Sequence, residues 1–368
     1  MGALQLELTE LIMDEVQSDY HNLRSCSLVC KSWVPRSSKH LFRSIKVPDP
    51  YYYRHAAVLL FCDSVLSSER MATSTEVLEV TIEPSTVAKV ALLFQHLPVL
   101  QSLTVSATPE LERRDYPPAP PSVKRHIEHL TVRALPMDIV AYFLGIFTSA
   151  SSLDINYCTG EAGPVPRTYR VKRLTISDVD GPALCAVSRL VEPSALERIP
   201  FEFPWQYPPP SAEDVNHFFH VLSAHIRELE YRMDSFSKVP LLGHPALHAC
   251  PVLESFIFTA PGETRLNPAS WRTILGPLSS LPPDVREVRF CTICGVPLET
   301  QDARDVTVLR TLDWPAVGRA LQHLNALQRL QIRGLRLPLR FDRPCGRARR
   351  PGRSPGKAAR APQKQDCF

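Results

Sequence analysis

Residues 127–132 read IEHLTV, residues 150–155 read ASSLDI and residues 171–176 read VKRLTI. Each segment has an apolar residue, two other residues, an apolar residue, one other residue and a last apolar residue. The last two apolar positions alternate as in a β-strand, whereas we expect the first on the turn before it. The recurrence of one pattern indicates a repeated structural unit rather than three unrelated strands.

The pattern recurs along most of the chain, and helical stretches separate several of its copies. The ten units are Val77-Val80-Ile82, Leu100-Leu103-Val105, Ile127-Leu130-Val132, Ala150-Leu153-Ile155, Val171-Leu174-Ile176, Leu196-Ile199-Phe201, Ile226-Leu229-Tyr231, Leu253-Phe256-Phe258, Val285-Val288-Phe290 and Leu327-Leu330-Ile332. Amphipathic helices are predicted at Thr86–His96, Met137–Phe147, Val215–Ala224 and Trp314–Leu324. Helix, turn and strand in regular order predict an α/β solenoid of alternating short strands and helices, in which each unit covers its neighbour's apolar face.

The spacing of these units resembles that of leucine-rich repeats. Successive units start 21 to 42 residues apart, and most intervals fall in or near the range of about 20–29 residues of that family. The asparagine that usually follows the strand is absent nearly everywhere, and Asn156 is the only near match. We therefore expect an irregular curve. The alternative interpretation is an ordinary α/β domain with a mixed sheet.

The first 47 residues carry more apolar side chains than a module of this size can bury. Two runs have helical spacing, namely Leu8, Leu11, Ile12 and Val16, followed by Leu23, Cys26, Cys30 and Trp33. Pro35 then interrupts the second run. A chain of about 40 residues is marginally stable alone, so the surplus apolar surface indicates that another polypeptide covers part of it. The alternative is an N-terminal cap that packs on the next domain.

These residues resemble an F-box, especially of the fungal type. The match comprises Glu7-Leu8, Leu11-Ile12, the block Ser27-Leu28-Val29-Cys30-Lys31-Ser32-Trp33 and the closing His40-Leu41-Phe42-Arg43. The block around Trp33 is the most specific part. The family opens with Leu-Pro, whereas this chain has Leu4-Gln5.

The resemblance implies a small three-helix module that binds the Skp-type adaptor of a cullin ubiquitin ligase. The implied adaptor contacts are Leu4, Leu8, Ile12, Val16, Leu23, Leu28, Val29 and Trp33. Some of these residues must form the module's own core instead. The expected organisation is an F-box at 1–47, a linker with a first helix at 48–76, the repeats at 77–341 and a basic tail at 342–368.

The leading hypothesis is therefore a non-catalytic substrate receptor of an SCF-type ligase, whose solenoid binds an unknown target protein for ubiquitin-dependent degradation. The alternative is a protein–protein interaction scaffold whose F-box no longer functions, and Gln5 favours it. Trp205 and Tyr207 lie in the aromatic, loop-like segment Phe201–Tyr207. They are candidate target contacts, since exposed Trp and Tyr often anchor interfaces, or they fill a gap between repeats.

An enzyme is the third hypothesis, and its motifs are sparse. No GxSxG elbow, HExxH pair or glycine-rich phosphate loop is present. His217 and His220 share one helical face, and Cys291 and Cys294 form a lone CxxC without a second pair. We expect buried thiols there, no metal and no cofactor.

Charge and cysteine content limit the cellular compartment and the binding partners that we expect. The tail from Asp342 has eight Lys or Arg and two Asp, which gives it a net charge of +6. The whole chain has a net charge of +4, so the remainder carries −2 and is near neutral. Nucleic acid is thus an unexpected partner except for a loose contact of this tail, which we expect to be disordered. Arg347, Arg349, Arg350 and Arg353 suit either a nuclear import signal or simple solvation. Scattered cysteines and the lack of a signal or membrane segment predict the cytoplasm or nucleus.

Overall fold

The structure is a computed structural model of the whole chain. It describes residues 6–29, 31–47, 56–83, 85–107, 125–163, 168–202, 210–232, 247–248, 250–261, 275–293, 313–332 and 335–337. Leu4, Gln5, Trp205, Tyr207, Cys294 and the tail at 342–368 lie outside the described residues, so the expectations about them are not addressed below.

The described strands form one long open sheet in which neighbours in the sheet are also neighbours in the chain. The strands are β1 (Ser44–Lys46), β2 (Val77–Ile82), β3 (Ser102–Ala107), β4 (His126–Arg133), β5 (Ser149–Asn156), β6 (Arg170–Ser177), β7 (Arg198–Glu202), β8 (Glu228–Arg232), β9 (Ser255–Pro261), β10 (Glu287–Ile293), β11 (Arg329–Ile332) and β12 (Leu335–Leu337). All neighbouring pairs from β1 to β11 are parallel, and β12 is antiparallel to β11. The α/β class predicted from the sequence is confirmed.

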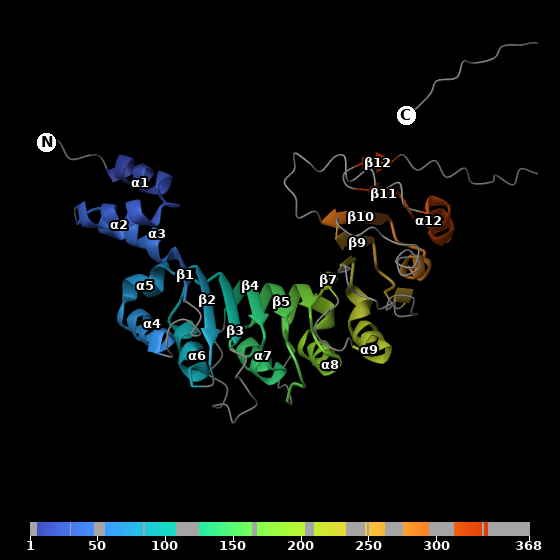
Figure 1. Cartoon of the computed structure of the whole chain (residues 1–368), viewed down its shortest axis with the longest axis horizontal. Helices are drawn as coiled ribbons and strands as arrows, with labels where there is room; N and C mark the ends of the chain where they lie inside the picture. The colour runs from blue at the N-terminus through green and yellow to red at the C-terminus, as the bar shows by residue number, and fades with distance from the viewer. Residues whose placement is uncertain are drawn as a thin grey trace, which may run out of the picture.

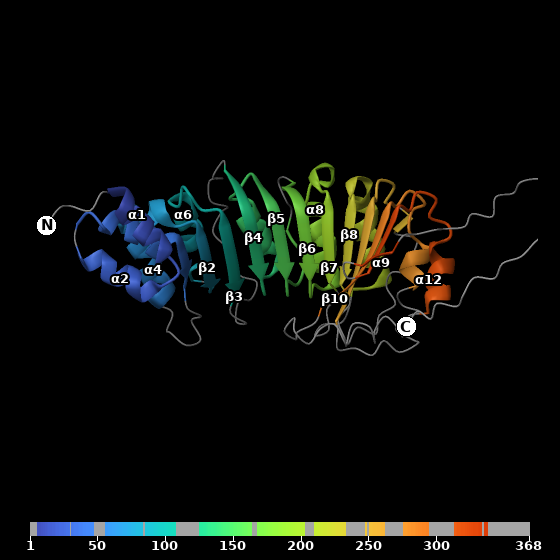
Figure 2. The same cartoon turned by 90° about the horizontal axis from the view of Figure 1, so that it is seen from above.

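Helices connect the parallel strands, as parallel pairing requires a crossover. The helices with defined bounds are α1 (Leu6–Glu15), α2 (Tyr20–Val29), α3 (Val34–Arg43), α4 (Ala56–Ser67), α5 (Glu69–Ser74), α6 (Val87–Gln95), α7 (Met137–Leu144), α8 (Gly181–Leu190), α9 (Ala212–Leu222) and α12 (Trp314–Leu321). Figure 1 shows the sheet as an arc with α6, α7, α8 and α9 on its outer, convex side. Figure 2 shows the opposite face of the strands, which these helices leave uncovered.

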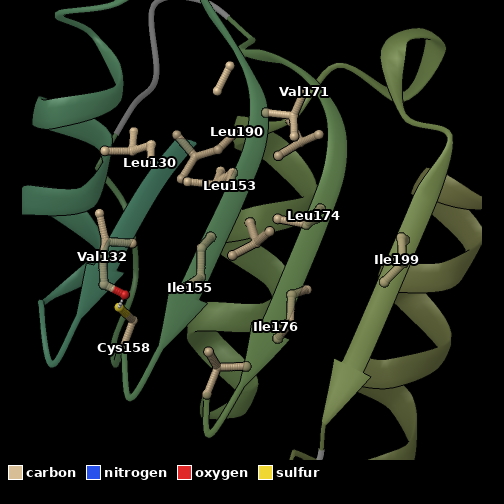
Figure 3. Close-up of a cluster of buried hydrophobic side chains, with 14 of the residues drawn as sticks. Leu130, Val132, Leu153, Ile155, Cys158, Val171, Leu174, Ile176, Leu190 and Ile199 are labelled. Carbon is tan, nitrogen blue, oxygen red and sulfur yellow. Dashed lines mark hydrogen bonds between the residues drawn. The ribbon is translucent and has the colours of Figure 1, made fainter. Parts of the chain in front are cut away.

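The core lies between the sheet and the helices, and two rows of strand residues form its sheet side. The first row is Leu78, Leu103, Leu130, Leu153, Leu174, Ile199, Leu229, Phe256, Val288 and Leu330, and the second is Val80, Val105, Val132, Ile155, Ile176, Phe201, Tyr231, Phe258 and Phe290. Each of these side chains is at most 7% exposed. Figure 3 shows how the members from β4, β5 and β6 gather into one cluster. The repeated pattern predicted both rows from β3 to β11, but not their members on β2.

A recurring hydrogen-bond arrangement explains why two residues separate the first two apolar positions of a unit. The amides of Glu128 and His129 both donate to the Gln101 carbonyl, each at 3.0 Å. The equivalent pair in the eighth strand, Arg227 and Glu228, donates to the Glu197 carbonyl at 2.9 and 3.1 Å. Two successive residues of one unit thus oppose a single residue of the preceding unit, as in a β-bulge.

The first predicted unit has the wrong register. Val77 is 38% exposed, whereas its neighbour Leu78 is fully buried and pairs with Leu103 of β3. Leu78 and Val80 pair with Leu103 and Val105 of β3, so the unit lies two residues earlier than predicted and the predicted face of the strand is still buried. Leu78, Val80 and Ile82 are all apolar and fully buried, so the hydrophobic pattern alone allowed both registers.

The turn after the strand is also repeated in the middle of the sheet. Ala134, Tyr157 and Asp178 directly follow β4, β5 and β6, and their φ angles are 55°, 55° and 52°. Non-glycine residues adopt this left-handed conformation rarely. Its recurrence at one position of three successive units shows that the similarity extends beyond the strands.

Cys158, the residue after Tyr157, provides a hydrogen bond between successive turns. Its buried thiol lies 3.9 Å from the Val132 carbonyl and 3.4 Å from the Asn156 carbonyl. Burial raises the pKa of this thiol to about 12. Asn156, the near match to the family's asparagine, is half-buried at the end of β5, whereas Cys158 occupies the buried site that contacts the preceding strand. Its thiol is accordingly structural and unreactive.

The helices match the predicted stretches in four places, at α6, α7, α9 and α12. Helix α8 was not anticipated, although its start carries recognisable signals. The Asp180 side chain accepts from the Ala183 amide at 2.8 Å, and Pro182 lies in the first turn. A capping carboxylate followed by an early proline is a known sign of a helix start.

Truncation of a residue in the first apolar row tests the shared core. We expect Leu153→Ala to lower the free energy of unfolding by about 3 kcal/mol, because Leu153 is fully buried and a cavity remains. Thr131→Ala, at an uncovered position of β4, is the control and should change it by less than about 0.5 kcal/mol. Urea denaturation followed by circular dichroism measures both, and equal effects would contradict the assignment of faces.

Candidate protein-binding surfaces

Residues 6–47, which we call the N-terminal helical module, have a small interior of their own. Met13 of α1 is fully buried and Leu23 of α2 is 2% exposed. Helices α1 and α2 both pack against α3. Pro35 was expected to end the second apolar run, and it lies in the first turn of α3, where a missing amide proton costs no hydrogen bond.

An ion-pair cluster fixes α1 against α3. The Arg36 guanidinium donates to Asp14 Oδ1 from Nε at 2.9 Å and to Asp14 Oδ2 from Nη2 at 2.6 Å. His40 Nε2 lies 2.7 Å from Asp14 Oδ1. The hydrogen bond from Arg36, aided by His40, holds the pKa of Asp14 below its ordinary value. These contacts set the orientation of α1, and hence of its outer face.

The outer faces of α1 and α2 carry large apolar side chains. On α1, Leu8, Leu11 and Ile12 are 47%, 61% and 41% exposed. On the last turn of α2, Leu28 and Val29 are 82% and 63% exposed. The three residues of α1 share one helical face, since they lie three and four positions apart. Contiguous exposed apolar residues of this kind mark interaction sites.

The structure separates the residues that the F-box resemblance assigned to adaptor contact. Leu8, Ile12, Leu28 and Val29 are exposed, while Val16 and Trp33 are half-buried. Leu23 lies in the interior of the N-terminal helical module, as was expected for some of the assigned residues.

Two exposed residues were missing from that assignment. Leu11, 61% exposed, could have been included because it lies three residues from Leu8 on the same helical face. Tyr20 is 60% exposed, and no periodicity in the sequence pointed to it.

The N-terminal helical module is held against the sheet by strand pairing, hydrogen bonds and helix packing. Its last residues form β1, which pairs with β2 through Ile45 and Leu78. The Arg43 side chain donates to Glu76 Oε2 at 2.8 Å, and the Glu76 amide donates to the Arg43 carbonyl at 2.9 Å. Helix α3 also packs against α5. The sheet therefore starts before residue 47, and the segment expected to be a linker with a first helix contains two helices, α4 and α5.

The uncovered face of the sheet is a second candidate surface, and its β7–β8 part is charged. Arg198 pairs with Glu228 at 2.8 Å and with Glu230 at 3.0 Å. Arg232 pairs with Glu230 at 2.8 Å. The Glu230 side chain is only 10% exposed. Burial alone raises its pKa, but the hydrogen bonds and charges of Arg232 and Arg198 outweigh this and leave the pKa below 4.5.

A similar arrangement continues on β10 and β11. Glu287 accepts from Arg289 at 2.6 Å and from Arg329 at 3.1 Å, and these bonds lower the pKa of Glu287. On both sides of β9, arginine and glutamate side chains of this face thus form ion pairs with one another.

The residues that suggested an enzyme do not form an assembled site in the described part of the chain. His217 and His220 are exposed on α9, and no group of three or more His, Cys, Asp or Glu residues among the described ones could hold a metal ion. Cys291 is half-buried on β10. Within the described ranges, no helix has both the length and the apolar character needed to cross a membrane.

Replacement of Glu230 tests the charged part of the sheet face. We expect Glu230→Gln to lower the free energy of unfolding at pH 7 by about 1–3 kcal/mol, since charged hydrogen bonds to two arginines are lost. Because the folded-state pKa is depressed, this stabilisation is present above the ordinary value of 4.5 and disappears as the pH falls through the folded-state pKa.

Urea titrations of the wild type and the variant between pH 7 and pH 3 measure the difference. Glu79→Gln is the control, because the pair of Glu79 with Lys46 is exposed and worth less than about 1 kcal/mol. A difference between wild type and Glu230→Gln that persists unchanged at pH 3 would exclude an ionic contribution.

Comparison with known proteins gives no assignment. No protein-family model matches the chain, and the search of curated proteins returned no match.

Proposed function

We propose that this chain is a substrate-recognition subunit of an SCF-type cullin ubiquitin ligase. In this proposal the N-terminal helical module is an F-box that binds a Skp-type adaptor, and the remaining units form a leucine-rich-repeat-like solenoid that binds a target protein. The observation that carries the proposal is the exposure of Leu28 and Val29, which belong to the most specific block of the F-box resemblance.

The exposure of Leu28 and Val29 supports the presence of a partner protein that covers them. A leucine that is 82% exposed contributes no burial energy, although full burial is worth about 1.5–3 kcal/mol. Val29, and Leu8, Leu11 and Ile12 on α1, are further exposed apolar side chains of the module. A partner that covers these side chains recovers this free energy, so the α1 and α2 faces suit a stable protein–protein interface.

The order of the strands supports the solenoid part of the proposal. Each described unit pairs only with the units before and after it in the chain, which is the contact pattern of repeat proteins. Such arrays offer one extended face to a partner. Tethering of a target through that face would bring a target lysine close to a ubiquitin-conjugating enzyme, so the chain would contribute proximity rather than acid–base chemistry.

Paired substitutions on α2 test adaptor binding. We expect Leu28→Glu combined with Val29→Glu to weaken binding of the full chain to the Skp-type adaptor by at least about tenfold, or about 1.4 kcal/mol, because two carboxylates would be buried in an apolar interface. Leu60→Glu is the matched control. Leu60 is 64% exposed on α4, outside the proposed interface, and its replacement should leave adaptor binding unchanged.

Isothermal titration calorimetry with purified adaptor, alongside circular dichroism of each variant, gives the readout. Equal binding by the double variant and the wild type would refute the proposed interface. Co-purification of the adaptor without the cullin would instead favour the scaffold alternative.

A further inference from the structure

The uncovered sheet face over β4, β5 and β6 differs from the charged face over β7 and β8. The register aligns His129, Ser152 and Arg173 in one row across these three strands, and it aligns Thr131, Asp154 and Thr175 in the next row. The residues that alternate with them are the buried members of the apolar rows. These six side chains therefore belong to the face that carries no described helix (Figure 2).

Arg173 lies in this region without a carboxylate partner among the described residues. It is half-buried, and its Nε is buried without a hydrogen-bond acceptor. A buried donor that lacks an acceptor costs about 1–3 kcal/mol, and more when the group is charged. The Nε of Arg198 and of Arg289 also lack an acceptor, but both of those guanidinium groups form ion pairs with glutamates. A bound anion would compensate the charge of the Arg173 guanidinium in the same way.

The neighbouring carboxylates are already engaged elsewhere. Arg198 of β7 lies opposite Arg173 of β6 in the strand register. Its guanidinium forms ion pairs with Glu228 and Glu230 of β8, on the side away from β6. On the other side, Asp154 accepts from the Ser152 hydroxyl at 3.4 Å and acts electrostatically on Arg232. The described acids of this face thus leave the Arg173 guanidinium available.

We propose that Arg173 binds an aspartate or glutamate side chain in an acidic segment of the target protein, an inference that rests on the proposed function. A guanidinium offers two parallel donors that match a carboxylate. The charge on the face favours a carboxylate over a phosphate group. One unpaired arginine beside Asp154 compensates a single negative charge, whereas a phosphate carries about −1.5 to −2 and is usually held by several arginines.

Selection from a library of short random peptides, with the full wild-type chain as bait, tests this inference. We expect aspartate and glutamate to be enriched among the selected peptides relative to the input library. Arg173→Gln should weaken binding of the selected acidic peptides by at least about tenfold. Arg170→Gln is the matched control on the same strand, because the Arg170 side chain is 69% exposed and already pairs with Glu192. It should bind as the wild type does.

Several outcomes would overturn the inference. These are no enrichment of acidic residues, equal binding by Arg173→Gln, or equal binding of peptides in which glutamine replaces glutamate. Tighter binding of phosphoserine peptides than of their glutamate counterparts would assign the site to phosphate instead. Thermal melts complete the test, since removal of an unpaired cation leaves no carboxylate orphaned. A melting temperature of Arg173→Gln well below that of the wild type would indicate a structural role.

This experiment is separable from the test of the proposed function. Arg173→Gln should bind the adaptor as the wild type does, and the Leu28 and Val29 variant should bind the acidic peptides normally. Failure of the wild-type chain to bind the adaptor, with acidic peptides still selected, refutes the ligase role alone. Normal adaptor binding together with equal binding of acidic peptides by the wild type and Arg173→Gln refutes the role of Arg173 alone.

Discussion

The two apolar rows of the sheet hold the molecule together, because no single unit can bury its own side chains. A strand such as β5 places Leu153 and Ile155 on the inner side, where both are fully buried. They are covered by the helices and by the equivalent residues of β4 and β6, as Figure 3 shows. Stability in such an array comes from contacts between neighbours, so the terminal units need a cover of another kind. At the start of the sheet β1 provides it, with Val47 4% exposed beside it.

The same constraint decides which surfaces are free to bind. Alternation along a strand commits one set of residues to the core and leaves the other set on the uncovered face. Over β7, β8, β10 and β11 this second set consists largely of arginine–glutamate pairs, exemplified by Arg198 with Glu230. Over β4 to β6 it consists of hydroxyl-bearing side chains, His129, Asp154 and Arg173, and Arg173 has no carboxylate partner among the described residues. A charge that is compensated within the chain adds little to binding, whereas an uncompensated one can select a partner.

The sequence predicted what depends on local periodicity and missed what depends on packing between elements. The spacing of Leu130 and Val132 suffices to place both in the core, because the period of a strand is two. It does not distinguish the pair Leu78 and Val80 from the pair Val80 and Ile82, since all three residues are apolar and only the register with β3 decides. The same limit explains Leu23. Helical spacing grouped it with Cys26 and Trp33 in one stripe, but the position of α3 determines which side of α2 is covered. Arg173 could not have been singled out at all, because its lack of a partner depends on the rotamers of Arg198 and its glutamates.

Two chemically different surfaces in one chain imply two different ways of binding. The α1 and α2 surface is apolar, so its association is driven by the removal of about 25 cal/mol per Å² of apolar area from water and depends little on salt. The face around Arg173 is polar, and a contact there depends on charge and is screened over about 10 Å at 0.1 M salt. A permanent partner suits the first kind of surface, and an exchangeable partner suits the second. The chain places the two surfaces on separate elements, so binding at one leaves the other accessible.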